Sequence, residues 1–214
     1  MDQQLLILFN RTWTHPTLDW IMATASSASV WLPFLILAAG LTLIFGGFRA
    51  RSFILCAALI LAFSDGLSAR FLKQTVGRPR PNDVRNDIRI VDLGKASPRI
   101  FALGKPLRIK MSRASEKTVA GRSFPSSHTV NNFAFATLAA AFFRRTGWLV
   151  FFPAALVGYS RIYVGSHYPS DVLVSIFLAV GQTLLILALF CWLWKKIGPR
   201  LTPRLFAAHP HLLA

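Results

Sequence analysis

The stretch DVLVSIFLAVGQTLLILALFCWLW, residues 171–194, decides the fold class of this chain. It contains a single charged side chain, that of Asp171, at its first position. About 20 apolar residues, each rising roughly 1.5 Å along a helix, cross the hydrocarbon core of a bilayer. The stretch is therefore predicted to form a membrane-spanning helix.

Four other stretches qualify as spans or come close. The chain is 54% hydrophobic with a mean hydropathy of +0.49. Only 15% of its residues are charged, against about 25% in an average soluble domain. The further stretches cover residues 30–47, 52–72, 128–143 and 147–163. Composition and pattern predict an all-α fold, a polytopic transmembrane helical bundle of about five spans.

The two ends of the chain lack the run of apolar residues that a span requires. Residues 1–20 hold a short apolar cluster between polar residues, so we expect an N-terminal interfacial helix. Trp13 and Trp20 would anchor it at the level of the lipid headgroups. Residues 199–214 are interrupted by prolines and are expected to form a flexible tail. The whole chain, residues 1–214, is predicted to be one domain.

Charge is distributed unevenly along the chain, with 24 Lys and Arg against 8 Asp and Glu. Three short polar connections carry basic pairs, namely Arg49 and Arg51, Arg144 and Arg145, and Lys195 and Lys196. The positive-inside rule makes this side cytoplasmic. The long segment 73–125 then lies on the non-cytoplasmic side, although its own basic charge argues the other way. We give the three short connections more weight, because an anion-binding site would explain the charge of the long segment.

Three polar clusters lie at the ends of predicted spans and fall on that same side. They are KQTVGRPRP (73–81), FPSSH (124–128) and SRIYVGSHYPSD (160–171). Arginine binds phosphate oxygens through two parallel hydrogen bonds, lysine adds a point charge, and the free N–H groups that open a helix face an anion. A phosphate site is therefore predicted, with these residues as candidates: Lys73, Arg80, Ser126, Ser127 and Arg161.

Two histidines in these clusters suit the chemistry of phosphate transfer. A carboxylate at Asp171, four residues after His167, could hold one nitrogen of that ring and leave the other free to attack. His128 would remain available to transfer a proton to a leaving oxygen.

Taken together, these clusters resemble the three-part phosphatase signature of the type 2 phosphatidic acid phosphatase (PAP2) superfamily, in its membrane lipid-phosphatase branch. The resemblance covers residues 73–171. The matching positions are Lys73-x6-Arg80-Pro81, Pro125-Ser126-Ser127-His128 and Ser160-Arg161-x5-His167-x3-Asp171. One position departs from the pattern, since the family commonly has glycine where this chain has Ser127.

The resemblance implies a role for each matching residue. His167 would attack phosphorus and form a phosphohistidine, with Asp171 orienting its ring. His128 would protonate the leaving oxygen and then activate water. The other matching residues, Lys73, Arg80, Ser126, Ser127 and Arg161, would bind the phosphate. The family works without a metal or another cofactor, so none is expected here.

The expected substrate is a phosphate monoester or diphosphate on a lipid, because the spans bring the site to headgroup depth. A polyprenyl diphosphate such as undecaprenyl diphosphate is the leading choice; phosphatidylglycerophosphate, phosphatidate and the phosphates of lipid A remain open. An inactive lipid-binding membrane scaffold is the alternative from another class. The expected partners are the lipid phosphate and the bilayer of a bacterial-type inner membrane. Nucleic acid is not expected, because the basic segment lacks the regular aromatic residues that stack on bases.

Three further expectations concern single features. Asp65, inside the second predicted span, should face the bundle, since a charge in lipid is costly. It is expected to make a structural hydrogen bond or to pair with Arg70 or a cation of the signature. Arg78, beside the signature, is expected to be solvated or to touch lipid headgroups. The basic residues of the segment 85–122 are expected to form a surface attracted to anionic lipid.

Overall fold

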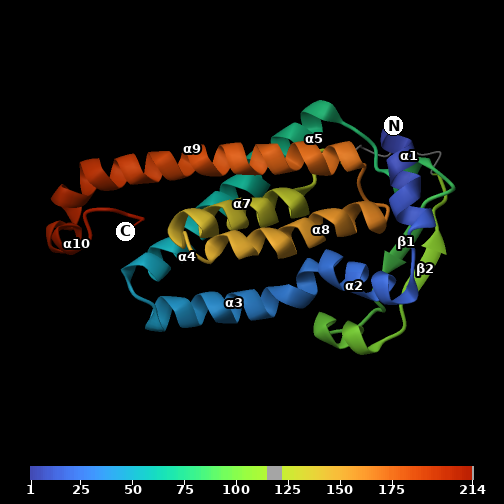
Figure 1. The fold of residues 1–214 in the computed structure, drawn as a ribbon, viewed down its shortest axis with the longest axis horizontal. Helices are drawn as coiled ribbons and strands as arrows, with labels where there is room; N and C mark the ends of the chain where they lie inside the picture. The colour runs from blue at the N-terminus through green and yellow to red at the C-terminus, as the bar shows by residue number, and fades with distance from the viewer. Residues whose placement is uncertain (115–121, 214) are drawn as a thin grey trace.

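The computed structural model describes residues 1–114 and 122–213, and these form a mostly helical bundle with a small sheet at one end (Figure 1). The α-helices are α1 (Asp2–Ile7), α2 (Pro16–Ser26), α3 (Ala28–Phe45), α4 (Phe48–Phe63), α5 (Arg70–Val76), α6 (Pro81–Val84), α7 (Ser127–Phe142), α8 (Phe151–Tyr163), α9 (Pro169–Leu201) and α10 (Pro203–Ala208). The strands are β1 (Arg89–Asp92) and β2 (Arg108–Met111). Shorter helical segments are π-helical at Leu8–Thr12 and Ser64–Ala69, and 3-10 at Arg99–Gly104 and Gly147–Val150.

Helix α7 lies at the centre of the bundle, where it packs against α4, α8 and α9. Its sequence is rich in alanine, and small side chains let neighbouring helices approach closely. Its largest core side chains include Phe133 and Phe142, which pack with Phe53 and Ile60 of α4. The helix that carries Ser127 and His128 is therefore surrounded by other helices along most of its length.

Within residues 1–114 and 122–213, three helical stretches are long and apolar enough to cross a membrane: Ala28–Phe45, Phe48–Val84 and Pro169–Leu201. The expected count of about five spans is not confirmed. Helix α7 has 16 residues and α8 has 13, both shorter than a typical span. Because α7 is enclosed by other helices, its apolar sequence reflects packing inside the bundle.

The N-terminal segment differs from the single interfacial helix expected from sequence. It forms α1, the π-helical turn and α2, and it packs against the end of the bundle where α8 stops and α9 starts (Figure 1). Leu6 and Asn10 are completely buried, while Trp13 and Trp20 stay exposed. The segment is therefore part of the folded core at this end of the molecule.

The long polar segment contains the one departure from an all-α fold in the described chain. Strands β1 and β2 pair in antiparallel register, from Arg89 opposite Met111 to Asp92 opposite Arg108. Val91 of β1 is buried in a cluster with Tyr163 of α8. This contact ties the sheet to the end of α8, and a short sheet needs such packing to be stable.

Some basic side chains of this segment have partners within the protein instead of facing lipid. Arg85, Arg89 and Arg99 form ion pairs with Asp87, Asp19 and Asp92, respectively. All four residues of β2 are exposed. Residues 115–121, which belong to the predicted lipid-attracted surface, lie outside the described residues, and that surface stays a prediction.

Two further expectations concern Asp65 and the C-terminal tail. Asp65 is exposed and does not face the bundle, but its charge acts on Lys73, one of the cations of the signature. The neighbouring Ser64 is the buried residue, where its hydroxyl accepts a hydrogen bond from Gln182 Nε2 at 2.6 Å. The predicted tail is partly helical, because α9 continues to Leu201 and α10 follows it. The indole of Trp194 donates to the His209 carbonyl at 3.0 Å and so holds α10 against α9.

Candidate active site

The turn between α8 and α9 carries most of the third cluster of the signature. The backbone N–H groups of Ser166 and His167 both donate to the Arg161 carbonyl, at 3.0 and 3.2 Å. Gly165 has a φ of 77°, and a Cβ there would lie 2.3 Å from Cγ2 of the buried Ile88. Only glycine combines a positive φ with the absence of a Cβ that would clash with Ile88, so Gly165 determines the path of the backbone through the turn.

The turn buries His167, of which only 2% remains exposed. Its Nδ1 lies 2.5 Å from the carbonyl oxygen of Ser123. A carbonyl can only accept, so the ring carries its proton on Nδ1 and keeps the lone pair on Nε2. Burial lowers the pKa of His167 well below its usual value, and the nearby positive charges of Arg161 and Arg80 lower it further. The ring is therefore a neutral imidazole with an unprotonated Nε2.

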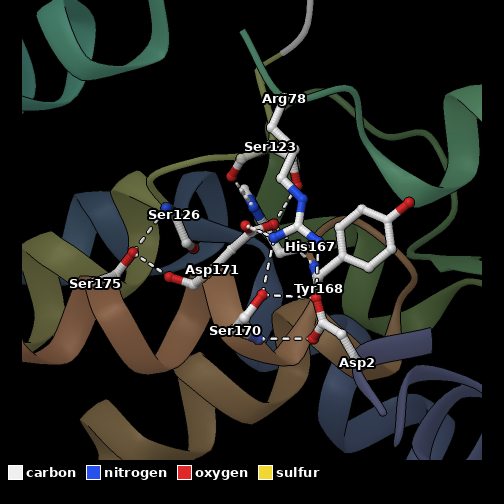
Figure 2. Close-up of polar contacts among 9 residues, drawn as sticks. All are labelled: Asp2, Arg78, Ser123, Ser126, His167, Tyr168, Ser170, Asp171 and Ser175. Carbon is white, nitrogen blue, oxygen red and sulfur yellow. Dashed lines mark hydrogen bonds and ion pairs between the residues drawn. The ribbon is translucent and has the colours of Figure 1, made fainter. Parts of the chain in front are cut away.

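Asp171 does not hold this ring directly, in contrast to the contact expected from sequence. Its carboxylate is fully buried and accepts hydrogen bonds from Arg78 Nη1 at 2.6 Å, from the Tyr168 backbone N–H at 3.0 Å and from the Ser123 hydroxyl (Figure 2). Both residues lie in the described part of the chain, and no hydrogen bond joins Asp171 to His167. The carboxylate acts on Ser123 instead, and the carbonyl of Ser123 orients the histidine.

The second cluster lies at the start of α7. Ser126 is completely buried and caps the helix, since its Oγ accepts from the Thr129 backbone N–H at 3.5 Å. The same Oγ also accepts from Thr129 Oγ1 at 2.9 Å. Its backbone N–H donates to Ser175 Oγ of α9, also at 2.9 Å (Figure 2). Ser127 is partly exposed, and its Oγ accepts from Lys73 Nζ at 2.5 Å. Ser126 thus holds the helix in place, whereas Ser127 and Lys73 stay at the open side of the site.

Two buried arginine nitrogens stand out by their lack of partners. Arg80 Nε and Arg161 Nε are inaccessible to solvent and have no acceptor among residues 1–114 and 122–213. The Nη1 of Arg161 is bound to Ser26, through its carbonyl at 3.3 Å and its hydroxyl. Buried donors are nearly always paired, so these two are suited to the oxygens of an anion. Both arginines are close enough to His167 to lower its pKa, which places them in the same site.

Sequence reasoning missed three residues of this arrangement: Asp2, Arg78 and Ser123. Arg78 was expected at most to touch lipid, but it forms ion pairs with Asp171 and Asp2. Arg78 lies between Gly77 and Pro79, inside the first cluster, and this position could have indicated a role in the site. Ser123 acts partly through its backbone carbonyl, for which no side-chain pattern exists.

No group of three or more His, Cys, Asp or Glu side chains within the described chain is arranged to hold a metal ion. The two cysteines, Cys56 and Cys191, are free thiols. The expectation of a site without a cofactor stays a prediction.

A family model decides the relationship suggested by this geometry, because the model of the PAP2 superfamily matches residues 51–197. The chain belongs to the PAP2 superfamily. The match includes every predicted site residue from Lys73 to Asp171. The protein is accordingly a phosphatase, a hydrolase of phosphate esters.

Individual PAP2 relatives align with different parts of the chain. The Lipid A 4′-phosphatase of Bacteroides thetaiotaomicron is 28% identical over 98% of this chain and 82% of the relative. The Lipid A 1-phosphatase of Rhizobium johnstonii is 32% identical over 63% of this chain and 48% of the relative. The Undecaprenyl-diphosphatase BcrC of Bacillus subtilis is 43% identical, but over only 28% of this chain and 32% of the relative.

A solved structure is also similar, that of LpxE from Aquifex aeolicus. It superposes with a TM-score of 0.58 and 27% identity, covering 87% of this chain and 94% of the other. The PAP2 arrangement of helices is thus shared over nearly the whole described chain.

Proposed function

We propose that the protein is an integral membrane phosphatase that removes phosphate from a lipid through a phosphohistidine at His167. The observation that carries this proposal is the buried, neutral imidazole, with Nδ1 bound to a carbonyl, in the same site as two buried arginine donors that lack acceptors among the described residues. The first feature prepares a nucleophile and the second binds the group it attacks.

The reaction proceeds in two displacements at phosphorus. In the first, Nε2 of His167 forms a bond to phosphorus while the bond to the lipid oxygen breaks, and His128 gives a proton to that oxygen. Burial and the nearby charges of Arg161, Lys73 and Arg80 lower the pKa of His128 to about 4. The negative charge of a bound phosphate offsets these cations, so His128 takes up the proton that it gives when the substrate binds. In the second, His128 takes a proton from water, whose oxygen attacks phosphorus as the N–P bond breaks. Inorganic phosphate leaves and His167 regains its lone pair. Arg80, Arg161 and Lys73 stabilise the negative charge on the other phosphate oxygens.

A phosphate of lipid A is the favoured substrate. Support comes from the extent of the similarity, since the lipid A 4′-phosphatase aligns with 98% of this chain, polar segment included. The exposed apolar residues of α3 and α9, among them Leu35 and Leu185, suit a substrate delivered from a bilayer.

Undecaprenyl diphosphate, the leading choice from sequence, is kept as a second candidate. One observation favours it: the BcrC proteins reach 44% and 43% identity, higher than the lipid A phosphatases, over about 60 residues. Those matches leave most of the chain uncovered, so we rank this substrate second.

We further propose that the site faces the non-cytoplasmic side. The basic residues that the positive-inside rule uses gather at the far end of the bundle, near α10, where Arg49, Arg144 and Arg145 line one open cavity. The turn with His167 lies at the other end, beside α1 and the sheet (Figure 1). The two ends therefore belong on opposite sides of a membrane.

Phosphate release by the protein in detergent tests this proposal. The substrates are lipid A, undecaprenyl diphosphate, phosphatidylglycerophosphate and phosphatidate, each with wild type, His167→Ala and His211→Ala. His211 is exposed at the far end and serves as the matched control. We expect release from lipid A, a loss of about 10³-fold or more in His167→Ala, and no loss in the control.

A trapping experiment examines the intermediate separately. Brief incubation with substrate labelled on the transferred phosphate should leave an acid-labile label on wild type and none on His167→Ala. Release that persists in His167→Ala would overturn the role of the nucleophile. Folded protein that releases phosphate from no lipid would overturn the enzymatic function and leave a lipid-binding scaffold.

A further inference from the structure

The carboxylate of Asp2, at the start of α1, reaches into the active-site end of the bundle. It accepts hydrogen bonds from the Ser170 backbone N–H at 3.0 Å and from the Ser170 hydroxyl at 2.6 Å, and it pairs with Arg78 Nη2 at 2.7 Å (Figure 2). Ser170 is 168 residues away in sequence and adjoins Asp171. We call Asp2, Arg78 and Ser170 the N-terminal clasp.

Arg78 joins the clasp to the catalytic machinery, because each of its two terminal nitrogens serves a different carboxylate. Nη2 binds Asp2, while Nη1 binds Asp171 at 2.6 Å and Ser170 Oγ at 2.8 Å. The guanidinium carbon also lies 4.0 Å from the ring centre of Tyr168, which fixes the plane of the group. A planar guanidinium group whose two terminal nitrogens are both bound can adopt only one orientation.

From Arg78 the contacts continue to the nucleophile without a gap. Asp171 accepts from Arg78 on one oxygen and from the Ser123 hydroxyl on the other, and the Ser123 carbonyl accepts from His167 Nδ1. The five side chains Asp2, Arg78, Asp171, Ser123 and His167 therefore form one connected path (Figure 2). The first of them lies in a segment outside the signature.

The N-terminal segment is anchored firmly enough to serve as a support. Leu6 is completely buried and packs in a cluster with Ile162, Tyr168 and Val172. Asn10, also completely buried, donates to the Tyr163 carbonyl at 2.6 Å and to the Arg89 carbonyl at 2.7 Å. Buried contacts of this kind hold a chain end that would otherwise fray.

We propose that Asp2 is a positioning residue for the nucleophile, which it holds in place through Arg78, Asp171 and Ser123. The proposal rests on the proposed function only in taking His167 as the nucleophile. Without Asp2, Arg78 would have Asp171 as its one carboxylate partner in this path and could rotate toward it. The Asp171 carboxylate would then shift relative to the Ser123 hydroxyl that it binds. The Ser123 carbonyl would shift with it, and the imidazole would lose its fixed direction of attack.

The charge of Asp2 is maintained at neutral pH. Burial opposes ionisation, but hydrogen bonds from Ser170 and Arg78 outweigh it and hold the pKa of Asp2 below its usual value. The carboxylate is therefore negative whenever the enzyme is folded near pH 7, and the clasp opens only as the pH falls through that lowered pKa.

Steady-state kinetics test the proposal with Asp2→Asn, which keeps the size of the side chain and removes its charge. Gln4→Ala is the matched control, since Gln4 lies in the same helix and is exposed. We expect kcat to fall by about 10-fold to 10²-fold in Asp2→Asn, with KM within about 2-fold. The losses from Asp2→Asn and Arg78→Gln should not multiply in the double variant, because both break the same path.

A second readout does not depend on activity. In protein labelled with ¹⁵N at histidine, the Nδ1 proton of His167, assigned by its absence in His167→Asn, should exchange slowly in wild type and in Gln4→Ala. It should exchange faster with water, or disappear, in Asp2→Asn. Ser170→Ala removes one donor to Asp2 and spares the ion pair, so it gives a smaller change of the same kind if Asp2→Asn folds poorly.

The outcomes separate the two proposals. A changed His167 signal in a protein that hydrolyses no lipid would support the clasp and overturn the function. An active protein in which Asp2→Asn matches Gln4→Ala in both kcat and proton exchange would overturn the clasp.

Discussion

Two polar regions meet at His167, and they differ in whether their hydrogen-bonding groups are satisfied. On one side, the carboxylates of Asp2 and Asp171 each accept three hydrogen bonds, and one donor to each is Arg78. On the other side, Arg80 Nε and Arg161 Nε are buried donors without an acceptor among the described residues. The satisfied region fixes geometry, and the unsatisfied region is prepared to bind.

The same difference separates two arginines only two positions apart. Arg78 is spread between two carboxylates and an aromatic ring, whereas Arg80 keeps a buried nitrogen with no acceptor in the described chain. A buried unpaired donor costs about 1–3 kcal/mol, a cost that proteins accept at sites where function needs it. Substitutions on the two sides should therefore have different signatures.

Removal of a cation from the unsatisfied region should give the largest effect. We expect Arg80→Gln to lower kcat/KM by about 10²-fold to 10³-fold, because charge on the transferred phosphate loses a donor. The midpoint of thermal unfolding should not fall. Added orthovanadate or inorganic phosphate should raise the midpoint of wild type but not that of Arg80→Gln. Arg108→Gln, on exposed β2, is the control. If Arg80→Gln strongly lowered the midpoint of thermal unfolding and still bound the anion, Arg80 would have a structural role, and the two regions would not differ as described.

Disruption of the satisfied region should cost stability as well as rate. Asp171→Asn leaves Arg78 with one of its two carboxylate partners, Asp2. The loss of a buried carboxylate from an ion pair costs several kcal/mol when both charges are enclosed. Because the Arg78 side chain is 33% exposed, we expect about 2 kcal/mol, or roughly 4–8 °C in the midpoint of unfolding. Ser175, which binds Ser126 and the Asp171 carbonyl, offers a comparison through Ser175→Ala. An Asp171→Asn variant as stable as wild type would contradict the structural role.

The protonation of His167 should follow from its burial. The folded pKa is lowered, whereas the unfolded chain takes up a proton near pH 6.5, so the folded state loses stability as the pH falls from 6.5 toward the folded pKa. The acid limb of the pH profile of kcat/KM should accordingly lie below pH 6.5. Histidine ¹⁵N shifts, compared with those of His167→Asn, measure this directly. A titration of His167 at pH 6.5 would show that the ring is not enclosed as described.

The smallest expected effect is that of a chelator. Lys73, Arg80 and Arg161 supply the positive charge that a phosphate requires, so EDTA should leave phosphate release unchanged within error. Release is compared before and after dialysis against EDTA, with and without added Mg²⁺. A loss that Mg²⁺ restores would assign part of the binding region to a metal.

The sequence predicted those parts of the molecule that show as a continuous apolar run or as a cluster of polar residues close together in the chain. The run 171–194 lies in α9, and the three clusters of the signature supply Lys73, Ser127, Arg80, Arg161 and His167 to one end of the bundle. Sequence could not predict that Asp171 acts through Ser123, because every residue carries a backbone carbonyl and no side-chain pattern marks the one that is used. It also could not connect Asp2 with Ser170, because contacts across 168 residues depend on the packing of everything between them.

The count of about five spans is not confirmed, for a related physical reason. Apolar sequence indicates burial, whether by lipid or by other helices, and α7 packs among α4, α8 and α9. The small sheet was missed because Val91 and Ile109 lie in short strands within a charged segment. The pairing is stabilised by the packing of β1, through Val91, against the end of α8.

The long separation between Asp2 and Ser170 in the sequence also determines when their contact can form during biosynthesis. A ribosome adds Ser170 168 residues after Asp2, so α1 must wait for the start of α9 before the contact between them can form. A nascent chain that already carries Lys73, Arg80 and His128 still lacks His167, and it cannot carry out the proposed reaction until α8 and the turn that follows it have also been made.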